Sequence, residues 1–441
     1  MKFCLTQRPW ILLTVIAFSI TVARSGGACT ETAVKEEVQT FDKKEELKNR
    51  LFSVFMLFRH GARTPNRHTT SGYIQNNMVQ PGMLTPVGEE QLRALGERAF
   101  KKYDIFEPKD VLFISSFRDR NVDSLDNFIL PYKEKIASHG YSEDAIRIFY
   151  THKDSDFLFH SQYFDKRFKA KREEIADEFK VKIDSMYEVA LSFGVEELLK
   201  KYYPIYETIN SSKKLSALSH LYTILRCNEV NQIDNPAKLD PKLLKLLEYS
   251  FSFQMYQVNY KQENFRRRRT NEILILLGKQ ILSILKPFEN YRSLYYKYFT
   301  KFSNTIYEVE PAMFLSAHDT NIMGILSTIL DASELTNDKF YIPDFAGYLK
   351  FELIDINEKD YFVELGHGIE GTTKTPNLQV KIKYYNHEIF MKRCGNKRCD
   401  VQSFIEFLND NTNDCHSHEC IRDIDIENVG EFKSSGNTLL I

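Results

Sequence analysis

The stretch FRHGARTP, residues 58–65, places a histidine between two arginines directly after the apolar run LFSVFML. A fixed positive charge beside an imidazole disfavours the protonated ring, so we expect the pKa of His60 to be lowered. A neutral imidazole can act as a nucleophile or as a base. Arg59 and Arg63 therefore indicate a reactive histidine, although one Arg–His pair at a strand end is also common as a purely structural contact.

Two further polar motifs also follow apolar runs. SAHDT carries His318 and Asp319 directly after an apolar run, and FRDRN, with Arg118 and Arg120, follows VLFISS. Open parallel sheets bind their ligands outside the carboxyl ends of the strands. We therefore expect three strand ends to bring these side chains, together with His60, toward one crevice.

This combination of residue types suits phosphoryl transfer. Guanidinium groups match phosphate oxygens with paired donors and stabilise the charge that develops during transfer. A neutral imidazole can attack phosphorus and carry the phosphoryl group covalently. A carboxylic acid beside a second histidine can protonate the leaving alkoxide and later activate water. The motifs therefore predict hydrolysis of a phosphate monoester without a metal or another cofactor.

The segments that position these motifs alternate between strand and helix patterns. Short apolar runs at 51–58, 111–116 and 313–317 predict buried strands. A helix is expected after Thr85, which can cap it, and Pro86 suits its first turn. The strand–helix–strand order predicts an α/β fold with a mostly parallel sheet flanked by helices.

The sequence pattern changes between the two parts of the chain that carry the motifs. Residues 131–287 carry long, mixed-charge, aromatic-rich helical patterns, which indicate an inserted α-helical cap. Residues 26–130 and 288–441 are then expected to form the α/β catalytic core. Segments near Leu349 and Val380 alternate as strands do, and we expect them to be late or edge members of the sheet.

The first 25 residues have the pattern of a secretory signal peptide. Lys2 and Arg8 precede the apolar run Ile11–Val22, and the small residues of ARS offer a cleavage site. The run is shorter than the roughly 20 residues that span a bilayer, which disfavours a signal anchor. We expect a product of the secretory pathway, either secreted or lysosomal or vacuolar, with no stable membrane insertion after cleavage.

Cysteine usage agrees with an oxidising compartment. Of seven cysteines, six lie beyond the expected signal peptide, and an even count there favours disulfides. The sequences CGNKRC and CHSHEC could each close a small loop. A zinc site from four cysteines with His416 and His418 is the alternative, disfavoured because CxxC spacing is absent. The pairing of the remaining cysteines stays open; they are Cys29, Cys227, Cys415 and Cys420.

Two weaker signals complete the pattern. The sequon NSS marks Asn210 as a glycosylation site in a secreted protein. The run FRRRR at 265–269 could bind polyanions or be a processing site, but more often such a run is a solvated helix start. With 59 basic and 60 acidic residues the chain has no overall field that favours nucleic acid.

Taken together, the motifs resemble the histidine acid phosphatase family, the branch of the histidine phosphatases with lysosomal and prostatic acid phosphatases and phytases. RHGxRxP is matched at every fixed position, namely Arg59, His60, Gly61, Arg63 and Pro65. The HD motif is matched by His318 and Asp319, LTPVGEEQ resembles LTxxGxxQ, and VLFISSFRDRN resembles the segment with a further phosphate-binding arginine. The similarity extends from about residue 48 to residue 420.

The resemblance implies a role for each matched residue. His60 would be the nucleophile and Asp319 the proton donor. Four side chains would bind phosphoryl oxygens: Arg59, Arg63, Arg120 and His318. Arg120 is preferred to Arg118 because relatives carry Asp-Arg-Thr where this chain has Asp-Arg-Asn. The family resemblance also implies a helical cap that sets the substrate range and a short disulfide loop between Cys394 and Cys399.

The expected function is that of an acid phosphatase acting on a small phosphomonoester. One alternative is a phytase or inositol-polyphosphate phosphatase of the same family, although multiple inositol-polyphosphate phosphatases usually carry HAE instead of HDT. Another is a catalytically silent secreted binding protein on this scaffold, against which the intact His60 and Asp319 argue. No nucleic-acid partner is expected, and a homodimer is left open.

Overall fold

The computed structural model describes most of the chain from residue 50 to residue 412. The expected signal peptide, the sequon at Asn210, and Cys29, Cys415 and Cys420 lie outside the described residues. The described ranges are 50–65, 79–160, 173–202, 211–233, 240–260, 263–303, 305, 307–330, 342–357, 376–395 and 397–412.

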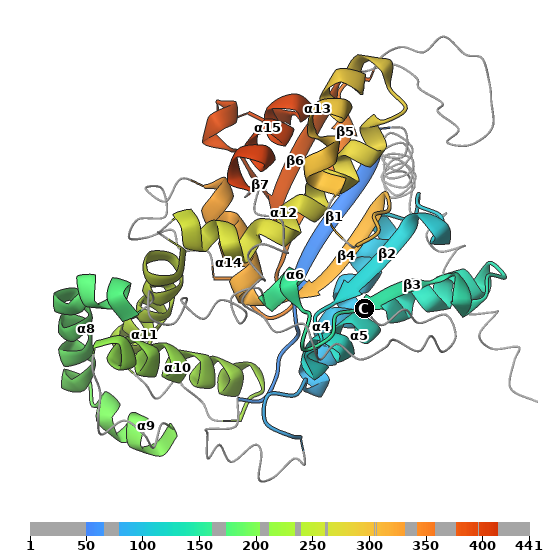
Figure 1. Ribbon diagram of the computed structural model, residues 1–441. Helices are drawn as coiled ribbons and strands as arrows, with labels where there is room; N and C mark the ends of the chain where they lie inside the picture. The colour runs from blue at the N-terminus through green and yellow to red at the C-terminus, as the bar shows by residue number, and fades with distance from the viewer. Residues whose placement is uncertain are drawn as a thin grey trace, which may run out of the picture. The chain divides into compact units, whose positions relative to one another are not determined.

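A mixed sheet lies at the centre of the described structure (Figure 1). Its strands follow the order β3-β2-β4-β1-β5-β6-β7, and β8 pairs with β6. In chain order these are β1 (Leu51–Arg59), β2 (Val111–Ser115), β3 (Arg147–Tyr150), β4 (Ala312–Ala317), β5 (Tyr348–Asp355), β6 (Leu378–Tyr384), β7 (His387–Ile389) and β8 (Cys399–Asp400).

The half of the sheet that carries the three motifs is parallel. Strands β1 and β2 both pair in parallel with β4, so that Phe58 and Ser115 each lie opposite Ser316. The carboxyl ends of these strands therefore meet at one edge, and the motifs that follow them converge there. From β1 onward the pairing is antiparallel, and β5, between β1 and β6, is an inner strand and not an edge.

Helices cover both faces of the sheet because side chains alternate between them along each strand. Val54 and Met56 of β1 pack with α4 (Pro86–Lys102) and α5 (Asp119–Ser138). Phe55 and Leu57 point into the opposite layer. That layer holds α6 (Phe157–His160), α12 (Glu263–Leu285), α13 (Arg292–Ser303), α14 (Asp319–Ile329) and α15 (Val401–Asn411).

A second group of helices packs around an apolar cluster of its own. These helices are α8 (Lys180–Ser192), α9 (Val195–Tyr202), α10 (Ser211–Val230) and α11 (Pro241–Phe253). A π-helix, η5 (Gln254–Tyr260), leads from α11 to α12, and its Tyr260 packs against Met323 of α14. Short 3-10 turns complete the structure: η1 (Pro108–Asp110), η2 (Glu143–Ala145), η6 (Glu289–Tyr291) and η7 (Lys392–Cys394).

The predicted α/β fold with a central sheet and flanking helices is confirmed. The helix expected after Thr85 is α4, where the Thr85 side chain accepts a hydrogen bond from the amide of Gly88 and Pro86 occupies the first turn. The division into core and cap stays a prediction. The range 131–287 begins inside α5 and contains β3, which pairs with β2 in the sheet. The arginine run lies in the first turns of α12, where Arg267 pairs with Glu263.

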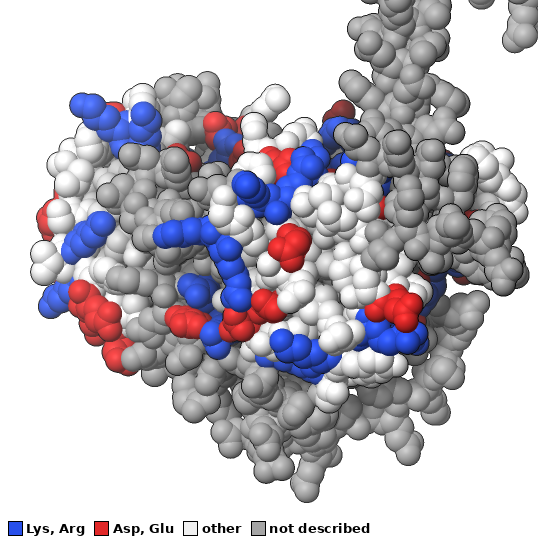
Figure 2. All heavy atoms as spheres, turned by 90° about the horizontal axis from the view of Figure 1, so that it is seen from above, with Lys and Arg blue, Asp and Glu red and all other residues white. Residues whose placement is uncertain are grey.

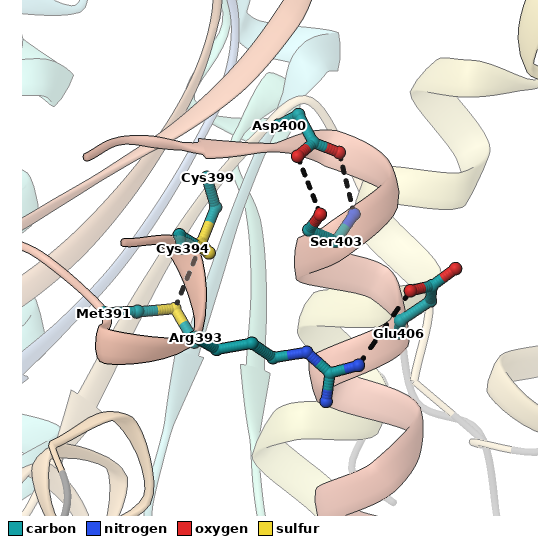
Figure 3. The surroundings of a disulfide bond; sticks show 7 residues. All are labelled: Met391, Arg393, Cys394, Cys399, Asp400, Ser403 and Glu406. Carbon is teal, nitrogen blue, oxygen red and sulfur yellow. Dashed lines mark hydrogen bonds and ion pairs between the residues drawn. A yellow bond between two sulfur atoms is a disulfide. The ribbon is translucent and has the colours of Figure 1, made fainter. Parts of the chain in front are cut away.

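The cysteines of CGNKRC form a disulfide, Cys394–Cys399. It joins η7 to β8 directly before α15, and the Met391 sulfur lies 3.6 Å from Cys399 Sγ (Figure 3). Asp400 caps α15 by accepting from the Ser403 amide at 2.9 Å. The disulfide thus fixes the entry to a helix that packs on the sheet, and it removes two ligands from the alternative zinc site.

Charges of both signs are interspersed on the described surface. Figure 2 shows lysine and arginine side chains close to aspartate and glutamate on the face seen from above. This agrees with the formal net charge of −1 for the chain. Within the described ranges, no helix combines the length and apolar character needed to cross a bilayer.

Candidate active site

The RHG motif leaves β1 as a buried loop that neighbouring strands hold from both sides. The amide of His60 donates to the carbonyl of Ala317 at 3.3 Å, and the amide of Ala346 donates to the carbonyl of His60 at 3.1 Å. The next amide, of Gly61, donates to Ser124 Oγ of α5 at 3.1 Å. His60 is therefore bound to β4 and to the segment before β5, and it is only 2% exposed.

Close packing of two backbones explains the glycine of RHG and the glycine of LTPVG. A Cβ on Gly61 would lie 2.4 Å from the carbonyl oxygen of Gly88, and a Cβ on Gly88 would lie 2.1 Å from the carbonyl oxygen of Ala62. Real side chains do not approach backbone this closely, so each position requires glycine. The first turn of α4 is therefore pressed directly against the RHG loop.

Arg59 joins the first motif to the HD motif. Its Nη2 lies 2.7 Å from Oδ2 of Asp319, the first residue of α14. Its Nη1 donates to the carbonyl of Pro343 at 2.6 Å, and the guanidinium lies 4.4 Å from the ring centre of Phe345. Arg59 is buried, whereas the Asp319 side chain retains 19% exposure. The carboxylate is thus held by the residue that precedes His60 and is partly open to solvent.

The hydrogen bonding of His60 determines which nitrogen is free to react. Nδ1 lies 2.9 Å from the carbonyl oxygen of Gly61. A carbonyl only accepts, so Nδ1 carries the proton and Nε2 of the neutral ring has the lone pair. Burial, followed by the charges of Arg120, Arg59 and Arg63, lowers the pKa of His60 well below 6.5. The structure therefore favours the neutral, nucleophilic imidazole that the sequence predicted.

Three arginines and the two histidines gather at the same edge. Burial and the nearby Arg63 lower the pKa of Arg120 to about 9, while Asp319 opposes that shift. The buried Nε atoms of Arg59 and Arg120 have no hydrogen-bond partner within the described part of the chain. Buried guanidinium donors close to one another suit an anion better than any neutral ligand.

Arg118 is close to this cluster but differently placed. It stands at the N-terminus of α5 and lies over the ring of Phe117, at 4.6 Å from the ring centre. Its charge contributes to lowering the pKa of Arg120 and of His318. Both cations of FRDRN therefore affect the site electrostatically.

His318 ends the loop after β4 and begins α14. Its amide donates to Oδ1 of Asn321 at 3.0 Å, and its ring centre lies 5.9 Å from that of His60. Burial, and then the charge of Arg120, lowers the pKa of His318 well below 6.5. All six residues expected at the site are therefore brought together, from three strand ends that are far apart in the sequence.

Helix α10 reaches the same loop from the second group of helices. Just beyond its end, Nδ2 of Asn231 donates to the carbonyl of Arg63 at 3.1 Å, and Thr85 Oγ1 donates to Asn231 Oδ1 at 2.7 Å. The thiol of Cys227 is fully buried against Ala62. Cys227 forms no disulfide with any cysteine of the described chain.

Sequence reasoning missed a third histidine. His160 of α6 lies with its ring centre 4.6 Å from that of His318 and is bonded to the buried carboxylate of Asp156. The Asp–x3–His spacing, which places both residues on one helix face, was the only available signal. Nothing in it indicated that this helix would lie beside β4.

The fold and this cluster agree with comparisons to known proteins. The family profile described as histidine phosphatase superfamily (branch 2) matches residues 50–367, and the chain belongs to this superfamily. The family and the site together define a phosphatase, a hydrolase of phosphate esters. No curated protein sequence matches the chain significantly.

Solved phytases share the fold at low sequence identity. Hafnia alvei phytase in complex with tartrate superposes with a TM-score of 0.55 at 15% identity, covering 82% of this chain and 97% of the phytase. The phytase of Klebsiella sp. ASR1 gives a TM-score of 0.52 at 15% identity, covering 82% of this chain and 96% of that chain. The superpositions show a common fold. Sequence identity this low leaves the substrate undecided.

Proposed function

We propose that this chain is an acid phosphatase that transfers the phosphoryl group of a phosphate monoester to His60 and then to water. The observation that carries the proposal is the neutral His60, protonated at Nδ1, among the charges of three arginines, one of which pairs with Asp319. Nε2 attacks phosphorus as the ester P–O bond breaks. The protonated carboxyl of Asp319 gives its proton to the leaving alkoxide.

The second step regenerates the enzyme. Asp319, now a carboxylate, accepts a proton from water while the water oxygen attacks phosphorus and the P–N bond to His60 breaks. Arg59, Arg63 and Arg120 bind the phosphoryl oxygens and stabilise the charge that develops on them, and His318 completes this set. The histidine leaves as a neutral ring, for which its lowered pKa is suited.

A trapping experiment tests the covalent step. Rapid acid-free quenching of the wild-type protein during turnover of ³²P-labelled substrate should yield base-stable, acid-labile phosphate on His60. His60→Ala should lose both the label and at least about 10³-fold in kcat. His139→Ala is the matched control, because His139 is an exposed histidine at the end of α5. Retention of substantial activity by His60→Ala would remove His60 from the nucleophile role.

An acidic cavity beside the site favours a simple monoester over phytate. It has a volume of about 240 Å³ and is lined by Tyr222, Arg226, Glu229, Leu244, Glu248, Ile342 and Asp344. Ile342 and Asp344 flank Pro343, whose carbonyl accepts from Arg59. Three carboxylates face one guanidinium there, and Arg226 is paired with Glu229 and Asp344. A ligand with several additional phosphates would be repelled at this place.

Substrate comparison separates the two candidate functions. The acid phosphatase proposal expects a higher kcat/KM for single phosphomonoesters than for phytate. Glu248→Lys should then raise the relative rate on phytate, because it reverses one of the charges that line the cavity. Equal or better use of phytate by the wild-type protein would favour the phytase alternative. The proposed secretory location rests on residues 1–25 and is tested by N-terminal sequencing of the secreted product.

A further inference from the structure

A buried polar network contacts the ring of His318. Oδ2 of Asp156 accepts from Nδ1 of His160 at 2.7 Å and from Oγ of Ser116 at 3.0 Å. Oγ of Ser116 lies 3.2 Å from Nε2 of His318. Asp156 and Ser116 are fully buried and His160 is 5% exposed, so water does not compete for these bonds. Asp156, His160 and Ser116 are called the Asp156 network below.

When the carboxyl of Asp156 is ionised, one arrangement of protons satisfies both of its bonds. The carboxylate of Asp156 accepts from both neighbours, so the single hydroxyl proton of Ser116 is directed to Asp156. Ser116 Oγ can then only accept from His318, which requires the proton of the neutral ring to be on Nε2. The buried carboxylate therefore determines the tautomer of His318 through one intervening hydroxyl.

The network is also held rigidly in the fold. Asp156 caps α6 by accepting from the amide of Phe159 at 3.1 Å. The carbonyl of Phe159 in turn accepts from Nδ2 of Asn321 at 2.9 Å, and Asn321 binds the amide of His318. The short helix α6 is thus bonded to α14 through Asn321, the residue that also holds the amide of His318. A ring held from both its backbone and its Nε2 has little freedom to rotate.

We propose that the Asp156 network positions His318 for phosphoryl transfer by fixing its ring orientation and its Nε2–H tautomer. The three residues are positioning residues, since they act through His318 and not on the substrate. The proposal rests on the proposed function in giving His318 a contact with the phosphoryl group. Because Nε2–H is bonded to Ser116, that contact falls to Nδ1, which takes up the acidic proton of a monoester monoanion and donates it back to a phosphoryl oxygen. The network itself rests on the geometry alone.

Kinetics of paired serine variants test the proposal. Ser116→Ala should lower kcat for p-nitrophenyl phosphate by roughly 10- to 100-fold, as expected when a reacting group is misplaced. Ser116→Thr keeps the hydroxyl and should restore most of the activity. Ser115→Ala is the matched control, because Ser115 is equally buried one residue earlier and its hydroxyl donates to the backbone carbonyl of Ser116.

A double-mutant cycle shows whether Ser116 acts through His318. In a His318→Ala background, Ser116→Ala should have no further effect on kcat, because the group that it positions is gone. A further loss of the same size in that background would overturn the proposal and assign Ser116 an independent structural role. Thermal unfolding of each variant identifies any that fail to fold. Ser116→Cys, which keeps the size of the side chain but forms only weak hydrogen bonds, then replaces Ser116→Ala in both backgrounds.

The tautomer can be read without any activity. Long-range ¹⁵N–¹H spectra of the wild-type protein should assign the Nε2–H form to His318, identified by the signal missing in His318→Ala. Ser116→Ala should abolish or mix that form. An Nδ1–H signal for His318 in the wild-type protein would overturn the proposal. If the protein hydrolyses no phosphomonoester but shows the Nε2–H signal, the proposed function fails and the positioning network stands.

Discussion

Nη2 of Arg59 and Oδ2 of Asp319 lie 2.7 Å apart, although 260 positions separate the two residues in the chain. The arginine that ends β1 thereby sets the position of the carboxylate that begins α14. The donor expected to protonate the leaving group and the cation expected to hold the phosphoryl oxygens are thus one unit. Changing either should affect leaving-group chemistry as well as binding.

Asp319→Asn should slow hydrolysis most for esters with poor leaving groups. An amide cannot supply the proton, so kcat for an alkyl phosphate should fall by about 10² to 10⁴. The leaving group of p-nitrophenyl phosphate scarcely needs a proton. For this substrate the rate constant of the first step, phosphoryl transfer to His60, should fall far less. The comparison is made by single-turnover kinetics on both substrates. Equal losses would transfer the donor role to another group.

The pH dependence of kcat/KM should have its maximum on the acid side. Burial and the three arginines lower the pKa of His60 well below 6.5, so the ring stays neutral and nucleophilic in mild acid. The neutral form, and with it the activity, is lost only when the pH falls through that lowered pKa. On the alkaline side a general acid loses its proton, and Arg120, with a pKa of about 9, begins to lose its charge.

A variant of Arg120 tests the cause of the acid limb. After burial, the charge of Arg120 is the largest influence that lowers the pKa of His60. Arg120→Gln should therefore move the acid limb of kcat/KM to higher pH, in addition to weakening substrate binding. Arg118→Gln is the matched control, because the charge of Arg118 is not among the main influences on the pKa of His60. An acid limb at the same position in Arg120→Gln would contradict this account.

Chelation should leave the activity unchanged. In the proposed mechanism the guanidinium groups supply the positive charge that metal ions supply in other phosphatases. Assays after dialysis against EDTA, with and without added Mg²⁺ or Zn²⁺, should give the same kcat. Loss of activity that is restored by one divalent ion would overturn the metal-free mechanism.

Gly88→Ala should disturb the active site although the residue touches no substrate. The added methyl group would lie 2.1 Å from the carbonyl oxygen of Ala62, so α4 and the RHG loop must separate. Overpacking of this kind costs about 1 to 3 kcal/mol, more than the helix gains from alanine. We expect a lower unfolding midpoint and a reduced kcat. A variant as stable and active as the wild type would show that the RHG loop accommodates the methyl group with no loss of stability.

Val87→Ala provides the control for Gly88→Ala. Val87 is the preceding residue of α4 and is 37% exposed, so its truncation leaves the contact with the RHG loop intact. Its activity should equal that of the wild type.

The sequence by itself determined the elements and residue types of this protein. Short apolar runs before each motif were enough to place β1, β2 and β4, because burial on both faces leaves a continuous apolar stretch. Thr85 and Pro86 were enough to place the start of α4, since capping is a local property. The motif residues His60, Asp319 and the arginines were also found locally, from the residue types and spacing within each short motif.

Only the tertiary structure decided how those residues meet. Strand order made β5 an inner strand and brought β1 and β2 to either side of β4, and no local pattern specifies which strands pair. The contact of Gly61 with Gly88 and the bond from Asp156 through Ser116 to His318 depend on the packing of separate elements. Such contacts arise from complementary surfaces between distant segments, and no pattern in the residues around His318 indicates them.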